Sequence, residues 1–268
     1  MKKQLLLTFL FTGVSLFAQV KDEWKINVGT MLVTNFETEM QLTPRNLPIS
    51  AKINTKDQLN MKNDTNVFRI DGYYRFTDKH SIDFSYFSVK SSGYTSSNKD
   101  IEFNDKFISA GASITSKFDM DVYKVNYGYS FYHSDEVELA LTAGLHITTI
   151  SLGLEATGTI DGVAAESTAS SAGITVPLPV FGFKGEYTII DKTLFINYKT
   201  EYFFLEYDTF RGNLHSSSIS LEYRFLENIG AGIGYNNNLI YLQVDDGDKK
   251  LEVQNALSGA MLYLTYIY

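Results

Sequence analysis

The feature that most constrains this chain is an alternation of apolar and polar residues that continues over segments longer than an ordinary globular strand. In residues 137–148 one set of alternate positions holds Val137, Leu139, Leu141, Ala143, Leu145 and Ile147, and the other holds Glu138, Ala140, Thr142, Gly144, His146 and Thr148. The same division recurs in residues 68–76, 123–131, 218–225 and 229–235. Because a period of two separates the two faces of a β-strand, the pattern predicts an all-β fold.

The contents of the two faces indicate which one points inward. A water-soluble β-sandwich also alternates, but it keeps its apolar face inward. Here the polar face carries charges such as Arg69 and Asp71 and the glycines Gly230, Gly232 and Gly234, whereas the apolar face is broad and aromatic at its ends. Apolar-out and polar-in faces with aromatic girdles are typical of a transmembrane barrel in an outer membrane. The glycines suit the crowded interior of a narrow barrel, and no helix follows them as a nucleotide-binding loop requires.

Composition excludes several other classes of protein. The 268 residues include no Cys, which excludes a disulfide scaffold and every thiolate metal site. The 44% hydrophobic and 14% aromatic content excludes a disordered chain. Beyond the N-terminus no apolar run approaches the ~20 residues that a membrane helix needs. The formal charge of −8 gives no electrostatic reason to expect a nucleic-acid partner.

The N-terminus has the three parts of a secretory signal. Lys2 and Lys3 precede an apolar stretch at 5–17, and the small residue Ala18 follows it. We therefore expect residues 1–18 to be a cleaved signal peptide and residues 19–268 to be the barrel, located in the bacterial outer membrane after export. An N-terminal core helix is the alternative, but charged, strand-like sequence begins at once from residue 21.

The spacing of turns predicts the topology. Short polar turns at 77–80, 133–136, 191–192 and 227–228 are typical of the periplasmic side, and longer connections at about 37–65, 93–118 and 158–173 are typical of the outer side. The last of these is a low-complexity stretch rich in Ala, Ser, Gly and Thr, which we interpret as a loop. The alternation then predicts strands near 24–36, 66–77, 80–92, 119–132, 136–156, 174–190, 193–208, 213–226, 229–244 and 251–268.

These segments predict an antiparallel up-and-down transmembrane β-barrel of about ten strands, within a range of eight to twelve, with both termini in the periplasm. The segments 40–60 and 101–117 are the ones that would raise the count to twelve by pairing. A two-residue turn at 191–192 gives a consistent register, in which Lys184 opposes Lys199 on the inward face. Glu201 then lies diagonal to Lys184, where it would offset the repulsion between the two lysines.

The last strand ends in a regular apolar pattern. One face holds Ala260, Leu262, Leu264, Tyr266 and Tyr268. A terminal aromatic residue with apolar residues at every second position before it resembles the signal that the barrel assembly machinery recognises, although the usual terminal residue is Phe. The alternative is an ordinary last strand with no recognition role.

Several strand blocks together carry a family resemblance. RIDGYYRFTDKH, VYKVNYGYSF, VELALTAGLHIT, PLPVFGFKGEY, LEYRF and GAGIGYN occur in this order. They resemble the successive strands of a group of uncharacterised Gram-negative outer-membrane β-barrel proteins, over about 66–268. The resemblance implies a fold and a location, and it supplies no catalytic residues.

The ionisable residues on the inward face are Arg69, Asp71, Arg75, Asp83, Lys124, Glu138, His146, Lys184, Glu186, Lys199, Glu201, Glu222 and Arg224. In a barrel of about ten strands such side chains fill the interior, and their mixed signs favour a paired network. The alternative is that they line a narrow water path or a ligand pocket. Their balanced signs argue against a strongly ion-selective pore.

Catalysis in a barrel would need a Ser, His and acid set or an Asp and His group that activates water. His80 and His133 fall in predicted turns, which leaves His146 and His215. His146 has no diagnostic Ser on its face, and only Ser217 of the serines next to His215 shares its face. We therefore predict no catalytic residues and a protein that is not an enzyme.

Metal binding is also not predicted. The turn at 245–250 holds Asp245, Asp246 and Asp248, but it lacks the Gly and Glu spacing of a calcium loop. A solvated outer turn is the preferred interpretation, and we predict no metal and no cofactor.

The sequence thus favours a structural or surface-interaction barrel with a narrow or plugged polar lumen. The alternatives are a small-solute channel of the porin type and a barrel hydrolase that acts on lipid or peptide at the outer rim. The expected partners are outer-membrane lipid, the barrel assembly machinery and an unidentified small solute or surface ligand.

Overall fold

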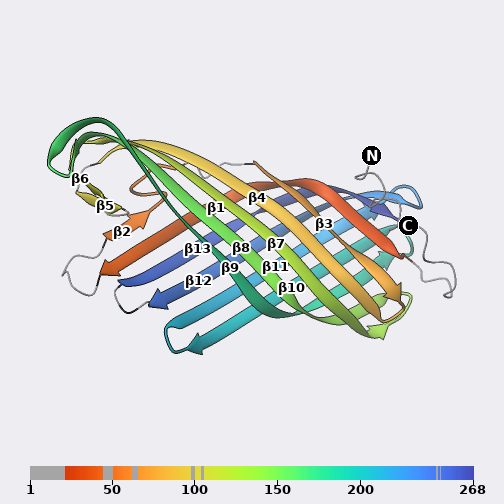
Figure 1. Ribbon diagram of the computed structural model, residues 1–268. Coiled ribbons are helices and arrows are strands. Elements are labelled where there is room, and N and C mark those ends of the chain that lie inside the picture. The colour runs from red at the N-terminus through yellow and green to blue at the C-terminus, as the bar shows by residue number, and fades with distance from the viewer. Residues whose placement is uncertain are drawn as a thin grey trace, which may run out of the picture.

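The computed structural model describes residues 22–44, 51–61, 66–97, 100–103, 106–245, 247 and 249–268. Ten of its strands form a closed antiparallel ring in which chain neighbours are also ring neighbours, and the pairing of β1 with β13 closes it (Figure 1). The ring strands are β1 (Trp24–Pro44), β3 (Asn66–Thr77), β4 (His80–Ser96), β7 (Ser113–His133), β8 (Val137–Ile160), β9 (Val163–Ile190), β10 (Leu194–Tyr207), β11 (Phe210–Arg224), β12 (Ile229–Asp245) and β13 (Lys249–Ile267). The predicted up-and-down barrel of about ten strands is confirmed.

The segments that could have raised the strand count form small additions at one end of the ring. They contain β2 (Ala51–Asn54), which pairs with β1, and β5 (Ile101–Phe103), which pairs with β6 (Lys106–Ile108). β6 in turn pairs with the end of β8. These short strands lie at the end with the longer connections, which is the outer end of an outer-membrane barrel.

The predicted outer loop at 158–173 is wrong. β8 and β9 continue through this stretch as a hairpin that closes at Asp161 and Gly162, whose φ angles are 51° and 79°. An Asp-Gly pair with both φ angles positive suits the tight turn between two twisted strands. The small side chains of this low-complexity stretch suggested a loop, but Thr and Ser at alternate positions are also compatible with a strand.

On ring strands such as β7 and β8, the apolar residues change from one face of the strand to the other partway along its length. On β7 the inward positions are apolar at Ile114, Phe118, Met120 and Val122, and then polar at Lys124, Asn126 and Ser130. The outward positions reverse in the opposite sense, from Thr115, Lys117, Asp119 and Asp121 to Tyr123, Val125, Tyr127 and Tyr129. We call the part with apolar residues outside the membrane half and the part with apolar residues inside the outer half.

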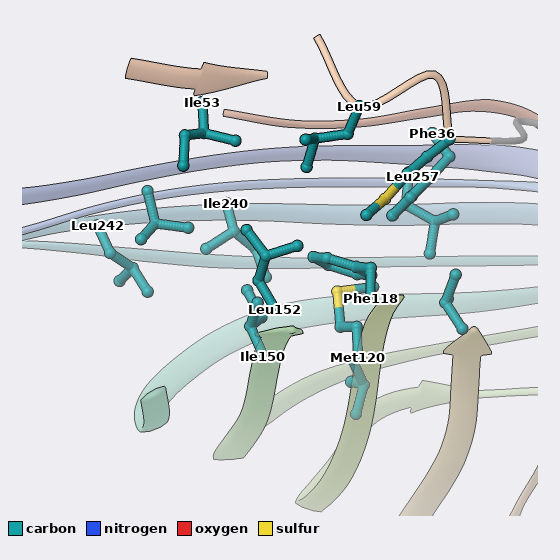
Figure 2. Packing of buried hydrophobic residues seen from close by; sticks show 14 of the residues in the cluster. Phe36, Ile53, Leu59, Phe118, Met120, Ile150, Leu152, Ile240, Leu242 and Leu257 are labelled. Atoms are coloured by element: carbon teal, nitrogen blue, oxygen red, sulfur yellow. The ribbon is translucent and has the colours of Figure 1, made fainter. Parts of the chain in front are cut away.

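The outer half contains a packed apolar core inside the ring. Figure 2 shows Phe118 and Met120 of β7 and Ile150 and Leu152 of β8 pointing toward residues of the opposite wall. That wall contributes Phe36, Ile240, Leu242 and Leu257, and the segment between β1 and β3 adds Ile53 and Leu59 from above. All of these side chains are buried. The ring is therefore filled at this level.

The membrane half carries an apolar belt on its outer surface. Tyr127, Leu141, Leu145, Ile233 and Leu264 are between 42% and 63% exposed and point away from the lumen. Aromatic side chains gather near the short turns. The ring centroids of Trp24 and Tyr74 are 4.4 Å apart, and the ring of Phe76 stacks on that of His80 with 5.8 Å between centroids. This arrangement matches the lipid-facing band and aromatic girdle of a membrane barrel. Among the described residues there is no helix long and apolar enough to cross a membrane.

Candidate functional site: the polar lumen of the membrane half

The lumen of the membrane half is polar because alternate residues of every ring strand point into it. Nearest the short turns, Lys25 of β1 lies 2.9 Å from Glu222 and 3.4 Å from Glu186. Arg224 bonds Glu222 at 3.1 Å and Asp22 at 3.2 Å. Glu222 is fully buried, so these two cations together compensate a carboxylate that has lost its contact with water.

A second group lies beside the first, on β3, β7 and β8. Arg75 bonds Glu138 at 2.6 Å, and the hydroxyl of Ser130 also donates to Glu138. The guanidinium of Arg75 lies 5.4 Å from the centre of the Tyr73 ring. The cation is thus paired with a carboxylate and packed against an aromatic face.

Deeper in the lumen two further pairs share the space. Lys184 bonds Asp83 at 2.8 Å, and Lys199 lies 3.8 Å from the same carboxylate. Nearby, Arg69 bonds Asp71 at 2.7 Å. The register predicted for β9 and β10 is found, with Lys199 opposite Lys184, but the expected partner of Lys184 is wrong because Asp83 takes the place assigned to Glu201.

Glu201 belongs instead to the group next to the apolar core. It accepts hydrogen bonds of 2.7 Å from both Lys124 and Asn126, which reach it across the lumen from β7. His146 of β8 is fully buried, with its Nδ1 3.8 Å from Glu201. Beyond this layer the inward positions become apolar.

All thirteen ionisable residues assigned to the lumen from the sequence lie on inward strand positions. The lumen groups that sequence reasoning missed include Lys25, Asn27 and Tyr263. Asn27 donates to Asp71 at 2.9 Å, and the Tyr263 hydroxyl donates to Ser220 at 3.0 Å. The signal for Lys25 was present, because it alternates with the apolar residues at 24, 26 and 28.

Connected cavities lead from the short turns into the lumen and become narrower. A mouth of ≈ 580 Å³ lies between the turns and shares Tyr73, Arg75 and Glu186 with an internal cavity of ≈ 80 Å³. That cavity shares Lys184 and Lys199 with a third of ≈ 40 Å³. A water molecule needs about 10–15 Å³ of such volume, so the two inner cavities together have room for roughly ten waters.

Among the described residues, no histidine has a hydrogen bond to a serine hydroxyl, as a nucleophilic serine site would require. His146 is enclosed in the lumen. His215 stacks on Tyr202 at 4.6 Å between centroids, and its Nε2 lies 3.5 Å from the Thr200 hydroxyl. His80 contacts the Tyr127 hydroxyl in the aromatic girdle, and His133 Nδ1 lies 3.6 Å from Glu138.

The part of the chain that the structure describes contains no cluster of three or more His, Asp or Glu residues suited to a metal ion. Of the turn at 245–250, Asp246 and Asp248 lie outside the described residues, as does the expected signal peptide at 1–18.

The residues of the expected assembly signal lie on the outer surface of β13. Leu262, Leu264, Tyr266 and Tyr268 are all exposed there, within the apolar belt. The backbone of Tyr268 exchanges two hydrogen bonds with Trp24, at 2.8 and 2.9 Å. The end of the last strand is thereby joined to the start of the first.

Comparison with known proteins identifies the class by its fold. No family profile matches the sequence, and no curated protein does. Among solved structures, the outer-membrane protease OmpT from Escherichia coli aligns with a TM-score of 0.60 at 10% identity, over 95% of this chain and 99% of that one. The toluene transporter TodX of Pseudomonas putida aligns at 0.38 and 8% identity, over 93% and 91%, and the attachment invasion locus protein Ail of Yersinia pestis at 0.28 and 10%, over 91% and 99%.

The chain therefore has the fold of Gram-negative outer-membrane β-barrel proteins, as its strand blocks indicated. At 10% identity the likeness shows the fold alone. The outward apolar belt and this fold together support the outer-membrane location predicted from the sequence.

Proposed function

We propose that the protein is a non-conducting outer-membrane barrel that presents a folded β-structure at the cell surface for interaction with other molecules. The observation that carries this proposal is the apolar core of the outer half. Phe203, Leu214 and Ile240 lie on the inward faces of their strands just beyond the layer of Glu201, and all three are buried. The polar cavities therefore end beneath a packed apolar layer.

Such a layer opposes conduction for a physical reason. An ion that passed it would lose its hydration without gaining oxygen ligands, and a dry apolar constriction is a barrier even to water. The charged groups below it are paired with one another, which makes them a structural filling of the barrel. The channel alternative has no specific observation in its favour.

The outer half has the surface of a water-exposed module. Lys117 and Glu155 are exposed on β7 and β8, and the outward positions between them and the belt are polar. An apolar interior and a polar exterior suit a structure that stands in water above the lipid. We infer that this exposed part, rather than the lumen, carries the interaction.

Planar-bilayer recording tests the proposal directly. Purified full-length protein in a lipid bilayer should give no discrete openings over the voltage range at which a general porin, recorded in the same chamber, conducts. Discrete openings that scale with the amount of inserted protein would overturn the proposal.

Export and assembly follow the same proposal. We infer cleavage after Ala18 from the N-terminal sequence. We also infer that the barrel assembly machinery recognises the last strand, because β13 presents a row of aromatic and apolar side chains up to Tyr268. Intact-mass measurement of membrane-extracted protein tests the cleavage. Deletion of Tyr268 should lower the yield of folded, heat-modifiable barrel, while a Tyr268→Phe variant should keep it; equal yields for both would contradict the recognition.

A further inference from the structure

Two ladders of the ring, β3–β4 and β9–β10, stop before the outer end. The β3–β4 ladder ends at Arg69 and Phe87, and the β9–β10 ladder ends at Tyr202 and Phe181. Beyond these points β4 and β9 each continue as long strands, paired on their other side with β7 and β8. In the outer half, β4 and β9 therefore each have one edge that is not paired with the next strand of the ring.

The edge of β4 is covered by the chain itself. The segment 55–61 runs along it, with the Asn60 side chain donating to the Tyr94 carbonyl at 3.3 Å. The hydroxyl of Ser116 lies 3.5 Å from the Leu59 carbonyl and 3.2 Å from that of Gly93. A Cβ added to Gly93 would lie 2.1 Å from the Leu59 carbonyl oxygen, so the two backbones are in close contact.

The β9–β10 ladder ends because of two prolines. Continuing its register would place Phe204 opposite Pro179. The N–H of Thr188 donates to Glu136 next to β8, so even-numbered residues of β9 direct their backbone groups to β8 and odd-numbered ones to the β10 side. Pro177 and Pro179 are odd-numbered and have no N–H to offer β10. Figure 1 shows the β8–β9 hairpin diverging from the β10–β11 hairpin at the outer end.

Beyond the prolines the edge of β9 regains its donors. Gly173 and Thr175 are odd-numbered and carry both N–H and C=O groups on the side away from β8. In the described part of the chain, β9 pairs at this level with β8 alone. Exposed edges of this kind are templates for an added strand unless proline, lysine or a covering segment blocks them.

The inner face beside this edge is apolar and uncovered. Leu205 and Tyr207 share the inward face of β10 with Phe203, yet they are 43% and 75% exposed, whereas Phe203 is 8% exposed. On the other side of the opening, Val176 and Leu178 of β9 are buried in the core. In the part of the wall that the structure describes, Leu205 and Tyr207 are therefore only partly covered.

We propose that the opening between β9 and β10 binds an extended segment of a partner protein, which adds to the edge of β9 and places apolar side chains at alternate positions over Leu205 and Tyr207. Strand addition gains affinity from backbone hydrogen bonds and specificity from alternate side chains. The segment 55–61 performs the corresponding role on β4. The inference names the partner class of the surface-interaction barrel and therefore rests on the proposed function.

A synthetic peptide tests the proposal on the full-length protein in lipid nanodiscs. The probe is a fluorescent peptide of about ten residues, an ordinary strand length, which alternates isoleucine with serine or lysine. Its control has the same composition with the isoleucines grouped together. Fluorescence anisotropy should show saturable binding of the alternating peptide and not of the control; equal binding of the two would overturn the proposal.

A matched pair of variants locates the binding. Thr175→Pro removes a donor from the free edge and leaves the β8 ladder intact, whereas Thr175→Val loses the same hydroxyl and keeps the donor. The peptide should bind the Thr175→Pro protein roughly tenfold more weakly than the Thr175→Val protein. Equal affinities would show that the edge is not used.

Two further measurements exclude other occupants. Leu205→Ser should also weaken binding, and it keeps the proposal testable if Thr175→Pro fails to give a heat-modifiable barrel. If oleate displaces the peptide equally from wild type and from both Thr175 variants, the opening binds lipid. If the protein dimerises with increasing concentration in sedimentation, the opening binds a second copy. Either result overturns the proposal. If the protein shows no conductance in bilayers and does not bind the peptide, this inference is wrong and the proposed function still holds.

Discussion

The two halves of the barrel are built from the same strands, but the apolar residues point inward in the outer half and outward in the membrane half. On β7, Met120 and Val122 point into the ring in the outer half, and two residues later Lys124 does so in the membrane half. The backbone pattern does not change between them, since β7 pairs continuously with β8 through this region. Alternation therefore defines two faces of each strand, and the solvent on each side decides which of them is apolar.

The boundary between the halves is sharp and lies at one level on neighbouring strands. Val122 of β7 pairs with Thr148 of β8, and the change of side occurs next to both residues. On β8 the outward Leu145 is 46% exposed in the belt, whereas the inward Ile150 is 1% exposed in the core. We interpret this level as the outer surface of the lipid.

The largest expected effect comes from the core of the outer half. Phe118 is fully buried, with its ring centroid 5.0 Å from that of Phe36. Phe118→Ala should lower the free energy of unfolding by about 4 kcal/mol, because it removes a large buried ring and leaves a cavity. Urea titration of protein folded into vesicles measures the change. Lys117→Ala, one residue away on the outer surface, should stay within about 0.5 kcal/mol, and a similar small loss for Phe118→Ala would mean that the outer half is not a packed core.

The next largest effect on stability tests where the outer surface of the lipid crosses the outward face of β8. Leu145 and Ser151 both point outward from β8, on opposite sides of the proposed lipid surface. Leu145→Arg should cost about 3 kcal/mol because it places a charge against lipid. Ser151→Arg should cost less than about 0.5 kcal/mol because it remains in water. Equal costs in the same titration would show that the boundary has been misplaced.

The smallest expected effect on stability comes from replacing a glycine in the lumen of the membrane half, with a glycine of the outer half as the control. A Cβ on Gly232 would lie 2.1 Å from the Tyr263 ring in the crowded lumen, whereas a Cβ on Gly153 would meet nothing nearer than 4.0 Å. Gly232→Ala should therefore destabilise the barrel by about 2 kcal/mol through overpacking. Gly153→Ala should change stability by less than about 0.5 kcal/mol, and equivalence of the two variants would contradict the packing described for the lumen.

The sequence predicted the fold well because its main signal is local. The ten ring strands, the short turns and the register of Lys184 against Lys199 all follow from alternation and turn spacing. Even the change of side was visible, since the apolar positions pass from even numbers at Met120 and Val122 to odd numbers at Tyr123 and Val125. The core of the outer half was not predicted, because the predicted faces of this strand rest on the residues from Tyr123 onward.

The pairing inside the lumen could not be predicted in the same way. Alternation indicates that Lys124 and Glu201 point inward, but they lie on β7 and β10 and meet across the ring at 2.7 Å. Hairpin register relates only neighbouring strands, so it gave Lys184 the wrong partner. The prolines at 177 and 179 were present in the sequence, but their role depends on which edge of β9 faces β10.

The closure of the ring by β1 and β13 has a kinetic consequence. The two strands pair from Lys25 with Ile267 to Pro44 with Lys249, so the contact that completes the barrel joins the two most distant strands in the chain. Such a contact forms slowly because a long loop must be closed first. Until then both edges of the sheet are open to other chains. The rate at which this one seam closes therefore sets how long each newly made molecule is exposed to aggregation.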